Sequence, residues 1–484
     1  MPIIRGLHGI AAASRWSMLT VNRLQVALYN ALPGSLQNGL CTVDGYRRCR
    51  HRFTPHFETK LDEWERTIDD PIESHHARQW EGLKKLIKRA RNHTRYYRFL
   101  PEVANTNDPE SGLEKTLKGI PILEKSVYRA RTNDFLANDI GPSDYVIRST
   151  SGTTGTAIKI FDSRERFAEN YAAVWRQRRR FGVTWKDPFF AFTGQMTTPL
   201  SQRRPPFWRF DRYSGRVLFS IYHMSPENLE AYLEPIHEIP ARYVEGYPSA
   251  LHLVSRAMID AGCCLPHGRL KAVFTSSESL LPRQRKTIER AFGAPIRDHY
   301  ASTEHVVSMT ACEQNMLHVD MEFGIVEIET QEETDEWVRG PLIVTGLGQP
   351  AAPMIRYRIG DVGTRSKNPC PCGRPGDAFF DMDGRIEDYV ITPDGRRLGR
   401  LDHVFKGRYD IAEAQIIQQK IDEIRVLVIP SSDWREDGIQ SLERALRQRL
   451  GSTMMVRVEP TDQIPREPNG KLRAVKSSLD GVRQ

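Results

Sequence analysis

The amino-acid sequence predicts an α/β fold, because strand-like and helix-like segments alternate along most of the chain. From about residue 145, short β-branched or aromatic runs such as Phe189–Phe192, Leu270–Thr275 and Ile325–Ile328 are separated by amphipathic helical patterns. This alternation is typical of a largely parallel sheet that is covered on both faces by helices. Two of these helices are expected at Tyr247–Gly262 and Pro282–Phe292.

The two ends of the chain differ from this central region. Residues 1–100 form a mainly helical lead-in, in which the segment Trp80–Tyr97 has apolar residues at helical spacing. Past residue 384 the pattern becomes that of a small α+β unit with a clear helix at Gly438–Leu450. We therefore expect a large N-terminal domain at residues 1–385 and a small C-terminal domain at residues 386–484.

Composition and charge exclude several classes of protein. The chain has 484 residues, of which 39% are hydrophobic and 27% charged, so it is long and apolar enough to bury more than one core. It contains no run of about 20 apolar residues that could span a bilayer. The net charge of +8 is small against 69 basic and 61 acidic residues, and we interpret the basic run Arg176–Arg180 as the solvated face of a helix at Arg164–Phe181. No nucleic-acid partner and no transmembrane segment are expected.

The N-terminus and the cysteines bear on location. No acidic residue precedes Asp44, and Arg5, Arg15 and Arg23 stand among apolar residues. Such a segment is compatible with a targeting or membrane-surface helix, but we favour an N-terminal helix packed on its own domain. The seven scattered cysteines indicate a reducing compartment and not a disulfide scaffold, so a cytoplasmic location is expected.

The strongest local motif is a hydroxyl-rich turn, Ser149–Thr156, which directly follows the apolar run Tyr145–Ile147. Six of its eight residues carry a hydroxyl group. Its two glycines permit a tight turn with positive φ, and the hydroxyls and exposed N–H groups can surround a polyphosphate. It is not a Walker loop, because no Gly-Lys-Ser/Thr follows the second glycine. The predicted phosphate-binding residues are Ser151, Gly152, Thr153, Thr154 and Gly155.

Five motifs in order resemble those of the adenylate-forming superfamily, which contains acyl- and aryl-CoA ligases, luciferases and peptide-synthetase adenylation domains. The first is the hydroxyl-rich turn. The others are Asp298–Glu304, Ile355–Asp361, Gly384-Arg385 and Pro468–Lys471, which are similar to the family's Tyr-Gly-x-Thr/Ser-Glu, Tyr-Arg-x-Gly-Asp, hinge and C-terminal Gly-Lys motifs. The resemblance runs from about residue 100 to the end. It implies a large multi-sheet N-terminal domain and a small, mobile C-terminal domain.

The resemblance gives these residues chemical roles. Attack of a carboxylate on the α-phosphorus of ATP brings two anions together, so cations and oriented dipoles must offset the charge. Glu304 would hold Mg²⁺ on the phosphates, and Thr303 would bond the α-phosphate. Asp361 would accept hydrogen bonds from the ribose, and Arg385 would reach ribose or phosphate oxygens. Lys471 would bridge the carboxylate and the α-phosphate during adenylation and then withdraw. The ordinary alternatives are a solvent-facing glutamate, a turn aspartate, a hinge salt bridge and a surface lysine.

Other residues are assigned to the adenine and nucleotide sites. Ser276, Ser277 and Glu278 follow a predicted strand and align with the family's turn near adenine. Asp298 and Tyr300 belong to the motif that ends at the proposed Mg²⁺ ligand and are expected to contact the nucleotide.

The acyl group is expected at Gly246 and Tyr247, which open a helix where backbone N–H groups and an aromatic wall meet, and at Ser276. Tyr247 is equally compatible with plain core. Rotation about Glu387 would open the site to the acceptor. Glu387 stands where the family commonly has Asp, Ala301 replaces a glycine, and Thr156-Ala157 replaces a Gly-Lys-Pro pattern. These departures indicate a divergent member, similar to the ligase-like proteins found with capsular polysaccharide biosynthesis.

A separate group of thiols and an imidazole predicts a metal site. Cys312 and His318 have Cys-x5-His spacing, and Cys370 and Cys372 form a Cys-x-Cys knuckle. Together they offer the ligands of a tetrahedral zinc site. The alternative is two unrelated loops with reduced thiols. The same arrangement occurs in the phenylacetate–CoA ligase branch, and the resemblance implies a structural zinc with no open position for catalysis.

The expected function is ATP-dependent adenylation of a small-molecule carboxylate with release of pyrophosphate, followed by acyl transfer to coenzyme A. ATP, Mg²⁺, coenzyme A and structural Zn²⁺ are the expected cofactors and cosubstrates. AMP transfer, or amide or ester formation on a sugar or cofactor, would use the same motifs and remains open. A non-catalytic nucleotide-binding scaffold is a further alternative, which the intact Glu304, Asp361 and Lys471 disfavour. The sequence also leaves a homodimer open.

Overall fold

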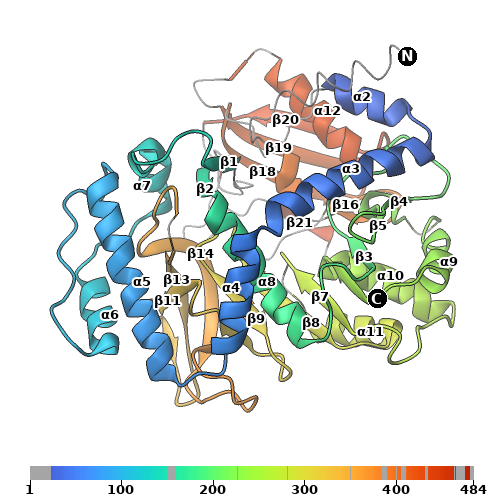
Figure 1. Ribbon diagram of the computed structural model, residues 1–484. Coiled ribbons are helices and arrows are strands. Elements are labelled where there is room, and N and C mark those ends of the chain that lie inside the picture. The colour runs from blue at the N-terminus through green and yellow to red at the C-terminus, as the bar shows by residue number, and fades with distance from the viewer. Residues whose placement is uncertain are drawn as a thin grey trace, which may run out of the picture.

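The chain folds around one long mixed sheet, with helices on its faces and a smaller sheet near the C-terminus (Figure 1). In the computed structural model the described residues are 23–149, 158–225, 227–278, 280, 282–348, 350–383, 390–398, 401–404, 410–430, 434–435, 437–462, 464 and 475–479. Within these ranges, no helix combines the length and apolar character needed to cross a bilayer.

The N-terminal part is helical. Its helices are α2 (Arg23–Ala31), α3 (Gly34–Arg52), α4 (Pro55–Thr67), α5 (Ile72–His93), α6 (Pro109–Lys118) and α7 (Lys125–Ala130). Helix α5 contains most of the predicted segment Trp80–Tyr97 but begins earlier, directly after Pro71, and ends at Thr94, which is extended. Its apolar face packs into a core with the antiparallel strands of the main sheet, beside which it lies in Figure 1.

The described residues form a 13-stranded main sheet, with strand order β11-β13-β14-β15-β10-β9-β8-β7-β6-β3-β5-β4 and β12 paired to β13. Its strands are β3 (Phe189–Phe192), β4 (Trp208–Asp211), β5 (Arg216–Phe219), β6 (Tyr243–Gly246), β7 (Ala272–Ser276), β8 (Ile296–Ala301), β9 (Ser308–Ala311), β10 (Leu317–Val319), β11 (Gly324–Ile328), β12 (Glu332–Glu333), β13 (Trp337–Gly346), β14 (Tyr357–Ser366) and β15 (Ala378–Asp383). A separate hairpin joins β1 (Tyr145–Ser149) to β2 (Lys159–Ser163).

Among the described strands of the main sheet, parallel pairing is confined to the neighbours β5, β3, β6, β7 and β8, so the expectation of a largely parallel sheet holds only for this part. The predicted strand Ile325–Ile328 lies in β11 and pairs antiparallel with β13. The reason is the length of the connections: short turns join antiparallel strands, whereas parallel strands need a crossover helix. The helices of this part are α8 (Arg164–Arg180), α9 (Glu230–Glu238), α10 (Pro248–Asp260) and α11 (Pro282–Phe292).

The two faces of the parallel strands bury different cores. One face packs against α9, α10 and α11 through residues such as Phe190, Val244 and Val273. The other packs against α4 and α8 through residues such as Phe189 and Phe274. Alternate residues of each strand point to opposite faces, so Arg216 and Glu245, which are in register with Phe189 and Phe274, lie on the α8 side.

The C-terminal segment forms its own four-stranded sheet, ordered β20-β19-β18-β21. Its elements are β16 (Val390–Ile391), β17 (Arg397–Leu398), β18 (Ile411–Lys420), β19 (Glu423–Pro430), α12 (Gly438–Leu450), β20 (Met455–Pro460) and β21 (Val475–Ser477). One hydrophobic core joins these elements. The predicted α/β class, with a large sheet and a smaller C-terminal sheet, is confirmed. The predicted boundary at residues 385 and 386 lies outside the described residues.

Candidate active site and metal centre

One cavity of about 1200 Å³ gathers residues from separate sequence motifs. The predicted site residues that line it are Gly246, Tyr247, Ser276, Ser277, Glu278, Asp298, Tyr300, Thr303, Glu304 and Asp361. These are all the predicted substrate, nucleotide and catalytic residues that the structure describes. The others, which lie outside the described residues, are Ser151, Gly152, Thr153, Thr154, Gly155, Arg385, Glu387 and Lys471.

The parallel strands bring the first of these residues together. Strands β6, β7 and β8 are neighbours and point the same way, so their carboxyl ends meet at one edge of the sheet, where α/β proteins commonly bind ligands. Gly246 ends β6, and a Cβ there would lie 2.8 Å from the Cβ of Phe192 and 2.9 Å from its carbonyl oxygen. Only glycine fits. Ser277 follows β7 with a φ of 74°, a strained conformation for a non-glycine residue that is often kept at functional turns.

Asp298 lies on β8 at this edge. The hydroxyl of Thr275, on the adjacent strand, donates a hydrogen bond of 2.6 Å to its carboxyl group. Burial raises the pKa of Asp298 to about 6, because the ionised form is poorly solvated there; the Thr275 hydrogen bond opposes this rise. The carboxyl group therefore changes charge close to neutral pH.

Tyr300 and Asp361 come from two motifs that are distant in sequence, and they meet in the cavity. The phenolic hydroxyl of Tyr300 donates a hydrogen bond of 2.6 Å to Oδ2 of Asp361. This contact joins β8 to β14 and fixes the orientation of the Asp361 carboxylate.

Glu304 is held by two groups that sequence reasoning did not select. The hydroxyl of Tyr357 donates to its Oε1 at 3.2 Å, and Nζ of Lys125 lies 3.8 Å from the same oxygen. The Glu304 side chain is 5% exposed, so its environment is fixed by these neighbours and not by water. Lys125 begins α7, well outside every motif, and the sequence carries no spacing signal for it.

A second cationic group lies near the predicted phosphate loop. Arg148 is on β1, directly before the loop, and it lines the cavity. Its Nη1 lies 2.9 Å from Oδ2 of Asp162, and Nδ1 of His305 lies 2.9 Å from the same oxygen. Burial alone would raise the pKa of Asp162, but His305 and Arg148 together hold it below its usual value. The charged side chain next to the loop is therefore anchored.

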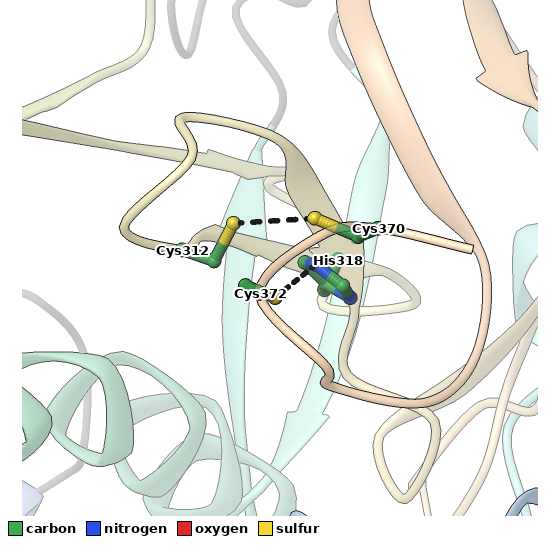
Figure 2. A group of neighbouring side chains, drawn as sticks. All are labelled: Cys312, His318, Cys370 and Cys372. Atoms are coloured by element: carbon green, nitrogen blue, oxygen red, sulfur yellow. Dashed lines mark hydrogen bonds between the residues drawn. The ribbon is translucent and has the colours of Figure 1, made fainter. Parts of the chain in front are cut away.

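The four predicted metal ligands form one cluster (Figure 2). Their candidate ligand atoms all lie within 4.8 Å of one another. The sulfurs of Cys312 and Cys370 are 3.7 Å apart, and the sulfur of Cys372 is 3.3 Å from Nε2 of His318. Figure 2 shows the side chains gathered around a common centre; Cys312 and His318 come from the β9–β10 hairpin, and Cys370 and Cys372 from the loop between β14 and β15.

These distances fit a tetrahedral metal. Two thiolates bound about 2.3 Å from one Zn²⁺ at the tetrahedral angle lie about 3.8 Å apart, which is close to the separation of Cys312 and Cys370. Three sulfurs and one imidazole complete four ligands, a closed set typical of structural zinc. Cys370 and Cys312 are 4% and 2% exposed, so their thiols are shielded from solvent.

The cluster adjoins the wall of the cavity, although none of its four side chains lines it. Cys312 follows β9, and His318 is on β10, so the two ligands flank the tip of the β9–β10 hairpin. The tip itself, Gln314–Leu317, lines the cavity. A metal here would fasten this hairpin to the loop between β14 and β15.

The interpretation of the basic run on α8 as a solvated face is wrong for Arg176, whereas Arg179 is partly exposed and Arg180 is exposed. Arg176 is 2% exposed and pairs with Asp320 at 2.6 Å and Glu322 at 3.0 Å. The next arginines pair with acidic residues too: Arg178 with Glu245 and Arg180 with Glu313. The arginines of this run are therefore paired with acidic groups of the protein, some buried and some exposed.

Comparison with known proteins agrees with this architecture. A family model described as the CapK C-terminal domain matches residues 390–478. The chain is 24% identical over 457 residues to Protein CapK of Staphylococcus aureus, covering 92% of this chain and 98% of that protein. It is 25% identical over 177 residues to phenylacetate-coenzyme A ligase of Thermus thermophilus, covering 31% of this chain and 39% of that protein.

Among solved structures, the chain resembles 2-hydroxyisobutyryl-CoA ligase in complex with 2-HIB-AMP and CoA. The TM-score is 0.56 at 18% sequence identity, covering 85% of this chain and 92% of that one. This likeness shows a shared fold. The sequence relatives and the fold agree with the resemblance of the motifs, and the chain is similar to adenylate-forming ligases of the phenylacetate–CoA ligase-like branch.

Proposed function

We propose that the chain activates a small-molecule carboxylic acid with ATP and passes the acyl group to coenzyme A. The observation that carries this proposal is the single cavity shared by every described residue that the motifs assign to nucleotide, acid and catalysis. In the first step a carboxylate oxygen attacks the α-phosphorus, the bond to the β-phosphate oxygen breaks, and pyrophosphate leaves. In the second step the coenzyme A sulfur attacks the acyl carbon, AMP leaves, and the thiol proton passes to solvent.

Glu304 is the proposed Mg²⁺ ligand. Carboxylate and phosphate oxygens are the ligands that Mg²⁺ prefers, and when bound the ion offsets phosphate charge. The fit rests on this chain's own geometry: Tyr357 and Lys125 hold the Glu304 carboxylate in one place at the cavity wall. Thr303, beside it in the cavity, is assigned to the α-phosphate.

Asp361 is the proposed acceptor for the ribose hydroxyls. Tyr300 fixes its carboxylate through a 2.6 Å hydrogen bond, and Asp298, Ser276, Ser277 and Glu278 are assigned to the nucleotide end of the same cavity. Arg148 and Lys125 add positive charge near the phosphates. The phosphate loop, Arg385, the hinge at Glu387 and Lys471 complete the proposal from the sequence motifs, with the C-terminal domain moving between the two steps.

The cysteine–histidine cluster is proposed to hold a structural Zn²⁺. The number, type and spacing of the four donors support this assignment. Its function would be to fix the hairpin that forms part of the cavity wall, with no part in the chemistry.

The test is carboxylate-dependent exchange of labelled pyrophosphate into ATP, screened over a library of acids. At least one acid should support exchange, and Lys471→Ala and Asp361→Ala should each lower the rate by about a hundredfold or more. Unchanged exchange in Lys471→Ala would refute the role of Lys471. If no acid in the library supports exchange, a nucleotide-binding scaffold describes the protein better than a ligase does.

Product analysis with and without coenzyme A identifies the acceptor. A new thioester that needs coenzyme A supports the proposal, whereas an adenylylated product, amide or ester formed without it would identify the alternative transfer reactions. The molecular mass of the same purified protein in solution would show whether the working form is a monomer or a homodimer. The reduced thiols are consistent with the proposed cytoplasmic location.

A further inference from the structure

The cavity extends beyond the nucleotide residues into a space lined by arginines. On the sheet side this space is lined by Phe189, Arg216 and Glu245, and on the helix side by Arg48 and Arg52 of α3 and Arg178 of α8. Strands β7, β6, β3 and β5 follow one another in the sheet. The space therefore starts next to the strands that carry the nucleotide residues and continues toward β5, underneath α3 and α8.

Two of these arginines are neutralised by carboxylates of the protein. Nη2 of Arg178 lies 2.8 Å from Oε2 of Glu245. Nη2 of Arg48 lies 3.1 Å from the buried Asp211, and its Nε lies 3.0 Å from the half-exposed Asp44. The acidic groups close to this space are therefore already paired.

The other two arginines have no such partner. Within the described part of the chain, no carboxylate lies within 4 Å of Arg216 or Arg52. Nη2 of Arg216 donates to the amide oxygen of Gln195 at 3.1 Å, but its Nε is buried without a hydrogen-bond partner. Arg216 is only 7% exposed. The guanidinium of Arg52 lies 4.5 Å from the ring centroid of Tyr171.

An unpaired guanidinium at this depth is unusual. Arginine keeps its charge in proteins, and a buried charge without a counter-ion is costly. The pKa of Arg216 is lowered to about 10, first by burial and then by the nearby charge of Arg48; Glu245 opposes this and Arg52 adds to it. The group is still charged at pH 7. Among the described residues, Arg216 and Arg52 thus keep positive charge without an ion-paired carboxylate at the cavity, which is the environment that an anionic ligand would complete.

The contacts of Gln195 connect this charge to the acyl end of the site. Arg48 and Arg216 donate to the same amide oxygen of Gln195, at 3.2 and 3.1 Å. The preceding residue, Gly194, lies against Tyr247, because a Cβ on Gly194 would be 3.2 Å from the Tyr247 hydroxyl. Tyr247 is the proposed wall of the acid site. The unpaired arginines are therefore behind the acid and not at the phosphates.

We propose that the acid activated by this chain carries a second anionic group, and that Arg216 and Arg52, with Arg48 beside them, bind it. This rests on the proposed function, since the site is assigned to the tail of the activated acid. Guanidinium groups bind carboxylate and phosphate oxygens in the same fork geometry. The shared chemistry is thus a terminal carboxylate or phosphate on the acid.

Helix α3 is held close to the sheet by a glycine. A Cβ on Gly45 would lie 2.1 Å from both carboxylate oxygens of Asp211, so α3 can approach β4 only because residue 45 has no side chain. Arg48 and Arg52 follow one and two turns later on the same helix. The close approach places both guanidinium groups over the cavity.

The test compares acids that differ only in the second charge. Pyrophosphate exchange is measured with the linear dicarboxylates from succinate to suberate, with monocarboxylates of matched length, and with 3-phosphoglycerate. The wild-type protein should prefer at least one dianionic acid over its matched monoacid by about tenfold or more in kcat/KM. The dicarboxylate and phosphate arms identify which anion is bound. Equal rates for the paired acids would overturn the proposal.

Variants locate the preference. Arg216→Met and Arg52→Gln should each remove most of the preference for the dianionic acid over its matched monoacid. Arg50→Gln is the charge-matched control, because Arg50 is exposed on the same helix and does not line the cavity. Arg216→Met should also raise the melting temperature, because it removes an unpaired buried charge. A preference that survives in both Arg216→Met and Arg52→Gln would contradict the assignment.

A binding measurement separates this proposal from the proposed function. Calorimetric titration of the wild-type protein with the same dicarboxylates needs no turnover. If no acid supports exchange but a dicarboxylate binds and Arg52→Gln abolishes binding, the anion site stands and the ligase proposal fails. If monoacids are activated and no dianionic acid is preferred or bound, the ligase proposal stands and the anion site fails.

Discussion

The hydroxyl of Tyr300 donates a 2.6 Å hydrogen bond to Asp361, although the two residues are 61 positions apart in the sequence. Tyr300 comes from the motif on β8 and Asp361 from the motif on β14. The contact ties together two parts of the proposed nucleotide site that the sequence presents as separate patterns.

Removing this contact should weaken the site without dismantling it. Tyr300→Phe leaves the ring in place but deletes a hydrogen bond to a carboxylate, so we expect the KM for ATP in pyrophosphate exchange to rise by about tenfold. Tyr213→Phe is the matched control, because Tyr213 is 45% exposed and does not line the cavity. A KM for ATP that is the same in both variants would mean that the contact does not orient Asp361 for ribose.

Asp298 should lower the stability of the fold as pH rises, which is the reverse of the usual effect of an aspartate with a lowered pKa. Its pKa is about 6 in the folded protein, above its ordinary value of 3.8, so between these values the folded chain holds a proton that the unfolded chain has lost. Asp298 therefore destabilises the fold progressively as pH rises from about 4 to 6, and the effect is constant above 6. Asp298→Asn keeps the Thr275 contact and removes the titration.

The measurement is urea unfolding of both proteins from pH 4 to 7. The stability of Asp298→Asn relative to wild type should increase up to about pH 6 and then level off. A difference that does not change over this range would show that Asp298 titrates normally.

Loss of the metal cluster should affect both metal content and stability. Cys372→Ser removes one of four donors, and we expect it to lose the zinc found by elemental analysis in the wild-type protein. Because metal affinity contributes to folding free energy, the melting temperature should fall by about 5 °C or more. Cys264→Ser changes a partly exposed cysteine outside the cluster, so this variant should keep the zinc content and the melting temperature of the wild-type protein. If elemental analysis finds no zinc in the purified wild-type protein, the proposed zinc site is refuted.

The buried arginine of α8 should matter far more than its exposed neighbour. Arg176→Met leaves Glu322 buried without its arginine and Asp320 with Arg374 as its remaining arginine partner, so we expect a loss of about 3 kcal/mol or more in the free energy of unfolding. Arg179→Gln removes a partly exposed arginine paired with acidic residues of α4 and should cost about 1 kcal/mol or less. Similar losses in the two variants, measured by urea unfolding, would contradict this account.

Local sequence patterns predicted those helices whose bounds are set by residues within the helix and at its ends. The helices at Pro282–Phe292 and Gly438–Leu450 have the predicted bounds, because apolar periodicity and terminal residues mark them. The start of α5 was placed too late, since the pattern is clearest from Trp80, whereas the helix begins after Pro71. Tyr300 and Asp361 were assigned to the nucleotide through the resemblance of their motifs, and both line one cavity.

Residues whose importance depends on distant neighbours were not predicted. Arg176 was interpreted as solvated because its counter-ions, Asp320 and Glu322, lie 144 and 146 positions away. Lys125 and Arg216 have ordinary sequence surroundings, and only the packing of α7, α3 and α8 on the sheet makes them line the cavity. Neither hydrophobic periodicity nor motif spacing in a single sequence indicates which charged side chains will be buried next to one another.

If the proposed anion site exists, the missing side chain at Gly45 makes its preference among acids depend on the position of helix α3. Even a methyl group there would collide with Asp211, so alanine would push α3 outward and carry Arg48 and Arg52 away from the acid. A relative with alanine at this position could thus prefer acids that lack a second anionic group, although every arginine is still present in its sequence. Counting arginines in an alignment would miss that change, whereas inspecting residue 45 would reveal it.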